Sequence, residues 1–485
     1  MLIPKEVKSV VTQLRKAGFE AFVVGGCVRD FLLKKEPNDW DVATNARPEE
    51  VQKIFPKSFY ENKFFTVTIQ TKSRKDSLKT IEVTTYRSEA RYGDKRHPDI
   101  VKFAKTIEED LSRRDFTVNA MAMEISGSKP KIIDPFEGQE DLKKKIIRAV
   151  GQPPKRFSED ALRMMRAVRF AATFNFRIEE KTAKAIKDNS DSLKHISPER
   201  IRDELVKIIM AQNSVQGVEL LRNLDLLKNI IPELEEGFGI SQNKHHIYDC
   251  YQHSLKSLEY ATKKKFNKQV RIAALLHDIG KPPTKQGKGQ EATFYGHEIV
   301  GAKMTKRILE RLKFSKKDIE KITKLVRYHL FYYHPDEVTE SSVRKLLKGV
   351  GSENIDELIQ LRMADRIGSG CPKAEPYKLR HFRYIIEKVS RDPVSVKMLK
   401  VSGNDIMKLL SIEPGPKVGQ ILDILFGYVL NDPAKNKKMV LEKEIKALGQ
   451  LSEKELVNLA QKAKQEREKI ETKKDEMTKQ KYWVT

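Results

Sequence analysis

The periodicity of the apolar residues changes at Gly151-Gln152-Pro153-Pro154, which divides the chain into two kinds of structure. Before this point, short β-branched or aromatic runs alternate with Gly, Pro, Asn and charged clusters, a pattern typical of strands. After it, apolar residues recur at helical spacing from Ser158 to about Leu430. We therefore predict an α+β fold in which a small mixed α/β head precedes mostly helical parts. The expected strands are Ala21–Val24, Asp39–Ala43, Thr66–Thr71, Ile81–Tyr86 and Ile100–Phe103, with helices that begin at Val28 and Pro48.

The charge of the chain favours a polyanionic partner. Its 485 residues include 93 Lys and Arg against 68 Asp and Glu, a net charge of +25. Such a surplus attracts nucleic acid, because Lys and Arg bind phosphates without regard to base sequence. The alternative is a charged surface that only keeps the protein soluble.

Composition also bears on the compartment. Apolar runs stay well short of the roughly 20 residues that span a bilayer, and the amphipathic stretch Met1–Gly18 lacks the features of a signal peptide. The cysteines, Cys27, Cys250 and Cys371, lie far apart and indicate neither a disulfide framework nor a cysteine zinc site. We expect a cytoplasmic protein that neither spans nor binds a membrane.

A turn between a strand and a helix carries the first candidate binding residues. Gly25 and Gly26 follow the strand Ala21–Val24 and let the backbone approach a ligand closely. Free amides at the start of a helix suit a phosphate group. Arg29, in the first turn, can add a charge-assisted hydrogen bond. Taken alone, this pattern is more often only a turn.

A carboxylate pair follows this turn. Asp39 and Asp41 stand two residues apart in an expected strand, so their side chains point to the same face. Such a pair can hold Mg²⁺, which prefers carboxylates together with substrate phosphates. Two metal ions clamp the attacking and leaving oxygens of a phosphoryl transfer. Glu82, at the start of another strand, is a third candidate carboxylate.

Several further motifs stand in a fixed order along the first half of the chain. They are Gly25-Gly26, Arg29-Asp30, Asp39 with Asp41, Arg113-Arg114-Asp115-Phe116-Thr117-Val118-Asn119-Ala120, Asp134-Pro135-Phe136-Glu137-Gly138, Glu159-Asp160-Ala161-Leu162-Arg163 and Glu199-Arg200-Ile201-Arg202-Asp203-Glu204. This series, over about residues 18–210, resembles the class II tRNA nucleotidyltransferases, the family of CCA-adding enzymes and bacterial poly(A) polymerases. The resemblance implies a nucleotidyltransferase head followed by a helical neck and body.

The resemblance also implies how the nucleotide is bound. Arg114 and Asp115 place a donor beside an acceptor, which suits a ribose hydroxyl pair, and Asn119 lies four residues further on the same helical face. Asp160 and Arg163, three residues apart on a helix, match the pair that reads the incoming base. A carboxylate accepts from the amine of cytosine or adenine, and a guanidinium donates to the ring acceptors.

Two more arginines, Arg166 and Arg169, continue the face of Asp160 and Arg163 and are candidates for the triphosphate or the tRNA end. Uracil and guanine carry a keto oxygen where Asp160 needs a donor, so we expect their rejection. The alternative for this helix is a solvated charged face over an apolar stripe.

Two segments bear on the product. One set of residues resembles the flexible loop that family members need to add the terminal A: Arg87, Glu89, Tyr92, Asp94, Arg96 and Pro98. The Gly-Arg-Arg-Phe signature of bacterial poly(A) polymerases is replaced by Glu61-Asn62-Lys63-Phe64-Phe65. Both favour template-independent addition of full CCA to tRNA from CTP and ATP. An A-adding enzyme, a poly(A) polymerase and a non-catalytic RNA-binding or nucleotide-sensing protein stay open.

A second group of candidate residues lies in the helical part. His277 and Asp278 close an apolar helix, and four more residues of the same kinds flank them: His253, His297, His329 and Asp365. Imidazole and carboxylate ligands together suit a divalent transition metal, which can activate water against a phosphate ester. The set resembles the HD superfamily of phosphohydrolases over roughly residues 241–370, with His297 and His329 matching the ligands of a second ion. The hypothesis is repair of damaged tRNA 3′ ends, and the alternative is an inactive scaffold.

These inferences divide the chain into four parts. We predict a catalytic head over 1–150, a neck and body with the base-reading helix over 151–240, an HD module over 241–372 and a basic helical tail over 373–485. A thin leucine stripe beyond Pro433 predicts one or two exposed helices with a frayed end. The expected ligands are tRNA, CTP, ATP, Mg²⁺ and a second divalent transition metal, without an obligate protein partner.

Overall fold

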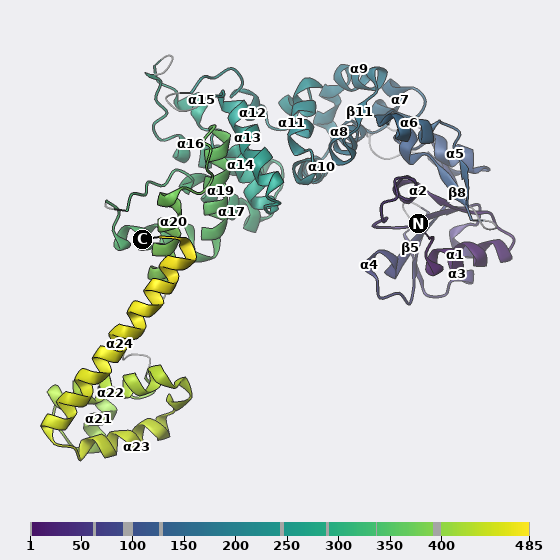
Figure 1. Cartoon of the computed structure of the whole chain (residues 1–485). Coiled ribbons are helices and arrows are strands. Elements are labelled where there is room, and N and C mark those ends of the chain that lie inside the picture. The colour runs from purple at the N-terminus through teal and green to yellow at the C-terminus, as the bar shows by residue number, and fades with distance from the viewer. Residues whose placement is uncertain are drawn as a thin grey trace. The chain divides into compact units, whose positions relative to one another are not determined.

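The computed structural model describes residues 2–61, 65–90, 100–125, 130–242, 247–287, 291–335, 337–390 and 399–484 (Figure 1). The chain forms two compact units: Met1–Leu330 with Asp356–Pro372, and Phe331–Ile355 with Lys373–Thr485. The division of the chain into four functional parts stays a prediction. No helix in the described part of the chain is long and apolar enough to cross a membrane.

A seven-stranded mixed sheet forms the N-terminal head, in the order β3-β4-β5-β2-β1-β8-β9. Neighbouring strands are antiparallel except β2 and β5, whose parallel register sets Asp41 opposite Glu82. Its strands are β1 (Ala21–Val24), β2 (Asp41–Thr44), β3 (Ser58–Glu61), β4 (Thr66–Gln70), β5 (Thr80–Thr85), β8 (Ala122–Glu124) and β9 (Lys131–Ile133). Its helices are α1 (Lys5–Lys16), α2 (Gly26–Leu32), α3 (Pro48–Ile54), α4 (Asp76–Lys79), α5 (Ile107–Ser112) and the 3₁₀ turn η1 (Thr117–Asn119).

The sheet confirms the mixed α/β head and corrects one boundary. Strand β2 begins at Asp41, so Asp39 lies in the bend before the strand instead of two positions along it. A separate pair of strands, β6 (Arg87–Ala90) and β7 (Ile100–Phe103), flanks the expected loop. Most of that loop, residues 91–99, lies outside the described residues, as do 62–64 of the Glu61–Phe65 segment.

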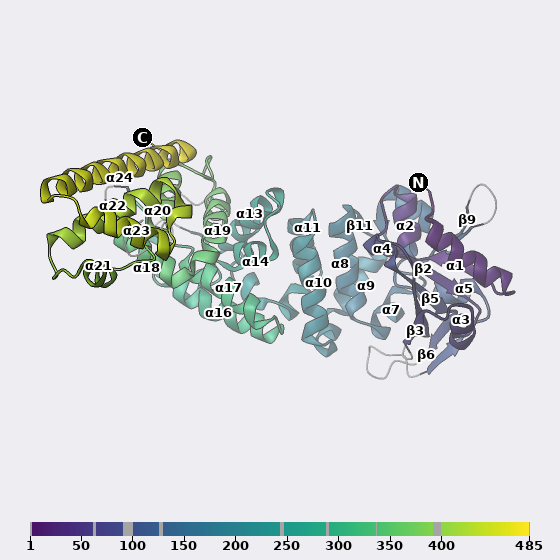
Figure 2. The ribbon, with the colours of Figure 1, turned by 90° about the horizontal axis from the view of Figure 1, so that it is seen from below.

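Helices make up most of the rest of the first unit, and α8, α10 and α11 pack on one another (Figure 2). Pro198 opens α10, where a fixed φ angle suits the first turn. The elements are α6 (Gly138–Lys144), β10 (Ile146–Ile147), α7 (Pro153–Glu159), α8 (Leu162–Phe174), β11 (Arg177–Ile178), α9 (Glu180–Asp188), α10 (Pro198–Met210), α11 (Ser214–Asn223) and α12 (Pro232–Glu235).

The helices that follow contain or adjoin the candidate metal-binding histidines. Side-chain caps fix the start of two of these helices. Asp249 accepts a hydrogen bond from the amide of Gln252, and Asn267 from that of Val270, which satisfies amides at the starts of α13 and α14. These helices are α13 (Cys250–Lys263), α14 (Lys268–Leu276), α15 (Lys281–Thr284), α16 (His297–Arg311), α17 (Lys316–Tyr328) and α19 (Ile355–Gly368).

The second unit contains helices around their own apolar core, which corrects the expected exposed tail. Leu441, Leu448 and Leu456 are buried in one apolar core that these helices share. Helix α24 spans 30 residues from a capping box at Ser452 to Tyr482, so the chain stays helical almost to its end. The helices are α18 (Glu340–Val350), α20 (Tyr377–Ser390), α21 (Gly403–Leu410), α22 (Pro416–Asn431), α23 (Lys438–Gly449) and α24 (Glu453–Tyr482).

Candidate active sites

Three carboxylates in the head share one electrostatic environment. Burial, and then the negative charges of Asp39 and Glu82, raise the pKa of Asp41 to about 6, against a lowering effect of Arg114. Asp39 and Glu82 are exposed at the end of the sheet. Crowding of like charges is relieved by a divalent cation, and carboxylate oxygens are the ligands that Mg²⁺ prefers. These residues therefore fit a magnesium site.

Position 25 requires glycine, because the backbone there has a positive φ angle and Arg114 lies close to it. Gly25 has a φ angle of +81°, and a Cβ atom there would lie 2.5 Å from a terminal nitrogen of Arg114 and 3.8 Å from Asp41 Oδ2. The guanidinium is held from the other side by buried Asp110, at 3.4 Å. A cation thus lies against the glycine turn and close enough to Asp41 to lower the pKa of that carboxyl, in a position suited to phosphate.

Arg29 is engaged within the protein. Its guanidinium donates to Asn119 Oδ1 at 2.6 Å and lies 4.5 Å from the centre of the Phe174 ring. It also donates to Asp30 at 2.9 Å, and it is buried. The guanidinium of Arg29 thus orients Asn119, and its bond to phosphate stays a prediction. A Cβ atom on Gly26 would lie 3.5 Å from a nitrogen of the same guanidinium.

Asp115 is the centre of a second network. Its carboxylate accepts from Arg166 Nε at 2.7 Å and from Asn119 Nδ2 at 3.2 Å. Burial alone would raise its pKa, but these partners outweigh burial and lower the pKa of Asp115 to about 2. Arg114 and Asp115, neighbours in sequence, contact different partners. The helical face predicted for Asp115 and Asn119 is wrong, because an extended residue and the 3₁₀ turn η1 stand in place of the expected helix. The two side chains are nevertheless in contact.

The expected base-reading pair lies at the junction of α7 and α8. Asp160 sits in extended conformation between the two helices and accepts from the amide of Leu162. The helical i, i+3 relation predicted for Asp160 and Arg163 is therefore wrong, because the helix starts after Asp160. Arg163 is in the first turn of α8.

Each member of that pair has an ionic partner elsewhere. Asp160 is bound by Arg200 at 2.8 Å, and Arg163 by Glu159 at 2.8 Å. Further along α8, Arg169 pairs with buried Glu204 at 3.1 Å. Arg200 and Glu204 belong to the motif Glu199–Glu204, for which the sequence alone predicts no role. The structure shows that this segment of α10 anchors the charged face of α8.

The histidines and aspartates of the helical part converge. Among the described residues, two groups have ligand atoms that all lie within 4.8 Å of one another. The first is His253, His277, Asp278 and Asp365, and the second is Asp278, His297 and His329. We call these six residues the histidine–aspartate cluster. All six are buried, and Asp278 belongs to both groups.

Backbone carbonyls orient three of the imidazoles. The Nδ1 atoms of His277, His297 and His329 lie 2.7 to 2.9 Å from the carbonyl oxygens three residues before them. A carbonyl accepts only, so each Nδ1 carries the proton and each Nε2 presents its lone pair. The Nε2 atoms face the carboxylates: His297 and His329 lie 3.4 and 3.5 Å from Asp278 Oδ1. Fixing the second nitrogen in this way is how proteins orient metal-binding histidines.

The electrostatics of the cluster fit divalent cations. Burial lowers the pKa of His253, but contacts at 3.0 Å with Asp278 and 3.3 Å with Asp365 prevail and raise it to about 9. Opposing its burial, Lys281 and the imidazoles hold the pKa of Asp278 well below its usual range. Lys281 lies 2.6 Å from Asp278 Oδ2 and was not singled out from the sequence. Two buried carboxylates and four imidazoles form a set suited to transition metals.

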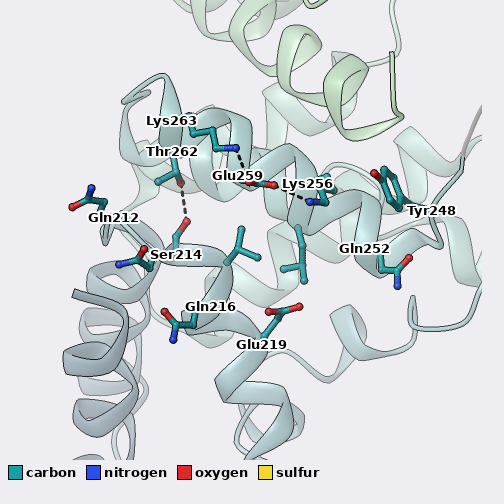
Figure 3. Close-up of a pocket in the computed structure, with 13 residues that line it drawn as sticks. Gln212, Ser214, Gln216, Glu219, Tyr248, Gln252, Lys256, Glu259, Thr262 and Lys263 are labelled. Carbon is teal, nitrogen blue, oxygen red and sulfur yellow. Dashed lines mark hydrogen bonds and ion pairs between the residues drawn. The ribbon is translucent and has the colours of Figure 1, made fainter. Parts of the chain in front are cut away.

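A hollow of about 670 Å³ opens beside the cluster, and we call it the metal-side hollow. Asp278, His297, His329 and Asp365 line it, so four of the six residues are reached from it. A second hollow, of about 520 Å³, lies between α11 and α13 (Figure 3). There the hydroxyls of Ser214 and Thr262 lie 2.8 Å apart, and Glu259 pairs with two lysines of its own helix.

Comparison with known proteins supplies the family. Three family models match: "Poly A polymerase head domain" at residues 21–148, "Probable RNA and SrmB- binding site of polymerase A" at 175–238 and "HD domain" at 250–369. A CCA-adding enzyme of Ligilactobacillus salivarius is 33% identical over 462 residues, which cover 91% of this chain and 99% of that protein. The chain belongs to the CCA-adding enzyme family.

Two further relatives support this membership. The chain is 49% identical over 222 residues to a CCA-adding enzyme of Lactobacillus helveticus, and this match spans 46% of the chain and 54% of that relative. Among solved structures, the CCA-adding enzyme of Bacillus stearothermophilus in complex with CTP is similar with a TM-score of 0.59. It is 28% identical and the match covers 92% of this chain and 98% of that one.

Proposed function

We propose that this member of the family adds C and A from CTP and ATP to the 3′ end of tRNA and so completes the CCA sequence. The observation that carries the proposal is the set Asp39, Asp41 and Glu82 beside Arg114, at the end of the sheet. The 3′-hydroxyl of the RNA attacks the α-phosphorus of the nucleotide, and pyrophosphate leaves. A tRNA substrate implies a cytoplasmic location.

In this proposal the three carboxylates hold Mg²⁺, which supplies charge neutralisation for the attacking and leaving oxygens when bound. Arg114 neutralises phosphate close to the Gly25 turn, where the absence of a side chain permits close approach. Asp115 and Asn119 are the polar groups for the ribose hydroxyls. Arg166, paired with Asp115, keeps that carboxylate ionised and available as an acceptor.

Nucleotide addition is tested on three tRNA transcripts, which end before CCA, after C and after CC. Each is offered CTP, ATP or both with Mg²⁺, and the products are sized to one nucleotide. We expect stepwise growth that stops at CCA. Addition of A alone to the CC end would make the protein an A-adding enzyme, and a long A ladder would make it a poly(A) polymerase. Absence of growth on every end would refute the proposal.

We also propose that Asp160 and Arg163 read the incoming base after release from Arg200 and Glu159. In Asp160→Asn, the amide can donate to the keto oxygen of uracil. We expect the ratio of kcat/KM for CTP over UTP to fall by about ten- to a hundredfold, since a paired base contact contributes about 1–3 kcal/mol of discrimination. Single-nucleotide incorporation measures this ratio. Asp203→Asn, an exposed carboxylate of α10, is the matched control. A lower rate with an unchanged ratio would make Asp160 a positioning residue only.

A second function has its own support: hydrolysis of phosphate esters at the histidine–aspartate cluster. Six buried ligand residues in two groups, with oriented Nε2 atoms and access from the metal-side hollow, favour two transition-metal ions over an inert scaffold. Such ions, when bound, lower the pKa of water so that it can attack phosphorus. The substrate that we propose is a damaged tRNA 3′ end that carries a phosphate or a 2′,3′-cyclic phosphate.

A further inference from the structure

One wall of the metal-side hollow carries two guanidinium groups. Helix α19 presents Arg362, Asp365 and Arg366 to the hollow, and because Asp365 and Arg366 follow Arg362 by three and four residues, the three lie on one face of the helix. Arg362 is bound to the metal-ligand candidate Asp365 at 2.7 Å. Metal binding alone does not need these guanidinium groups, because they repel cations. They suit a phosphate bound next to the metal ions.

An exposed aromatic ring stands at the same hollow. Tyr295 lines it and is 82% exposed, whereas its neighbour Phe294 is buried at 8%. The backbone on both sides of Tyr295 is fixed: the carbonyl of Phe294 lies 2.7 Å from His297 Nδ1, and Gly296 turns the chain with a φ angle of +73°. Tyr295 therefore stands two residues before the metal-ligand candidate His297, and its ring is exposed instead of packed in the core.

We propose that Tyr295 stacks on a nucleobase in the metal-side hollow. The site then takes phosphate esters of nucleosides, such as the phosphorylated 3′ end of an RNA, in preference to esters without a base. A tyrosine face binds any base by stacking, while Arg362 and Arg366 bind the phosphate. This inference rests on the proposed phosphohydrolase function of the same site. In that reaction a water oxygen bonds to phosphorus, one ribose P–O bond breaks, and the ribose oxygen takes the proton.

Two substrates with the same reacting ring test the inference. The full chain with Mn²⁺ is assayed on 2′,3′-cyclic AMP and on glycerol 1,2-cyclic phosphate, which lacks a base. For Tyr295→Ala we expect kcat/KM to fall by about ten- to a hundredfold on the nucleotide and to stay within about twofold on the glycerol ester, since only the former stacks. Tyr295→Phe should restore the nucleotide activity. Trp483→Ala removes another aromatic ring, 78% exposed, and should change neither.

A binding measurement separates this inference from the hydrolysis on which it rests. Stacking quenches the fluorescence of 2-aminopurine riboside 3′-monophosphate, so the metal-free protein and Tyr295→Phe should quench it and Tyr295→Ala should not. Equal losses on both cyclic substrates, or equal quenching by all three proteins, would overturn the role of Tyr295. If the unaltered protein hydrolyses neither substrate but the quenching difference is present, the phosphohydrolase proposal fails and base stacking stands.

Discussion

Asp41→Asn is expected to abolish the addition of both CMP and AMP, with a fall of at least about 10³-fold in the incorporation rate, because a lost metal ligand removes several kcal/mol of charge stabilisation. The substitution keeps the size of a side chain that is half-buried at the start of β2. It removes the negative charge that Asp39 and Glu82 face. The assay is primer extension on the CC-ended transcript with ATP and on the transcript without CCA with CTP.

Two comparisons make this result specific. Asp76→Asn changes a carboxylate of the head that is 91% exposed, and it should leave incorporation unchanged. Binding of tRNA to Asp41→Asn, measured by filter retention, should match that of the unaltered protein. Incorporation that survives in Asp41→Asn would remove Asp41 from the catalytic site, and loss of tRNA binding would show that the substitution disturbs the fold.

His277→Ala should have the converse effect. It removes one Nε2 from the first metal group, and we expect hydrolysis of 2′,3′-cyclic AMP to fall by at least about 10³-fold, since the metal supplies several kcal/mol to the attack. Nucleotide addition should stay within about twofold, because no ligand of the head is altered. Loss of both activities together would contradict the proposal of two separate sites.

Metal binding can be followed in the same variant without a substrate. An ion at a hundred times its Kd stabilises the folded chain by about 2.7 kcal/mol, so Mn²⁺ should raise the thermal midpoint of the unaltered protein. The shift should be reduced in His277→Ala, which loses a ligand of one of the two groups, and kept in full in His195→Ala, an exposed histidine outside the cluster. A shift of the same size in His277→Ala would exclude His277 as a ligand.

Local patterns explain what the sequence could predict. The predicted bounds of strand β1 match those observed, because a short apolar run followed by a Gly-Gly turn is a local signal within a few residues. The histidine–aspartate cluster was predicted residue by residue, because each member lies in a recognisable motif. These residues then meet within 4.8 Å in two groups, as an ion site requires.

The sequence did not predict contacts between residues that lie far apart in the chain. Asp160 and Arg200 are 40 residues apart, and their ion pair depends on the packing of α8 against α10, which periodicity does not report. The contacts of Arg29 with Asn119 and Phe174 likewise join residues distant in sequence, and no local pattern predicts them. The leucines beyond Pro433 are too sparse in sequence to predict a core. In the structure, apolar residues of α21, α22, α23 and α24 together form one core.

The shared carboxylate of Asp278 makes the two metal groups unequal. Its Oδ1 faces His297 and His329, while its Oδ2 faces His253. An ion in the first group draws on Asp278 together with three other residues, whereas an ion in the second has two histidines besides the same carboxylate. Loss of His297 would therefore leave a complete one-ion centre, but loss of Asp278 would dismantle both. Either group can therefore be lost alone through a ligand that the other does not use, and among these six residues only Asp278 is shared by both groups.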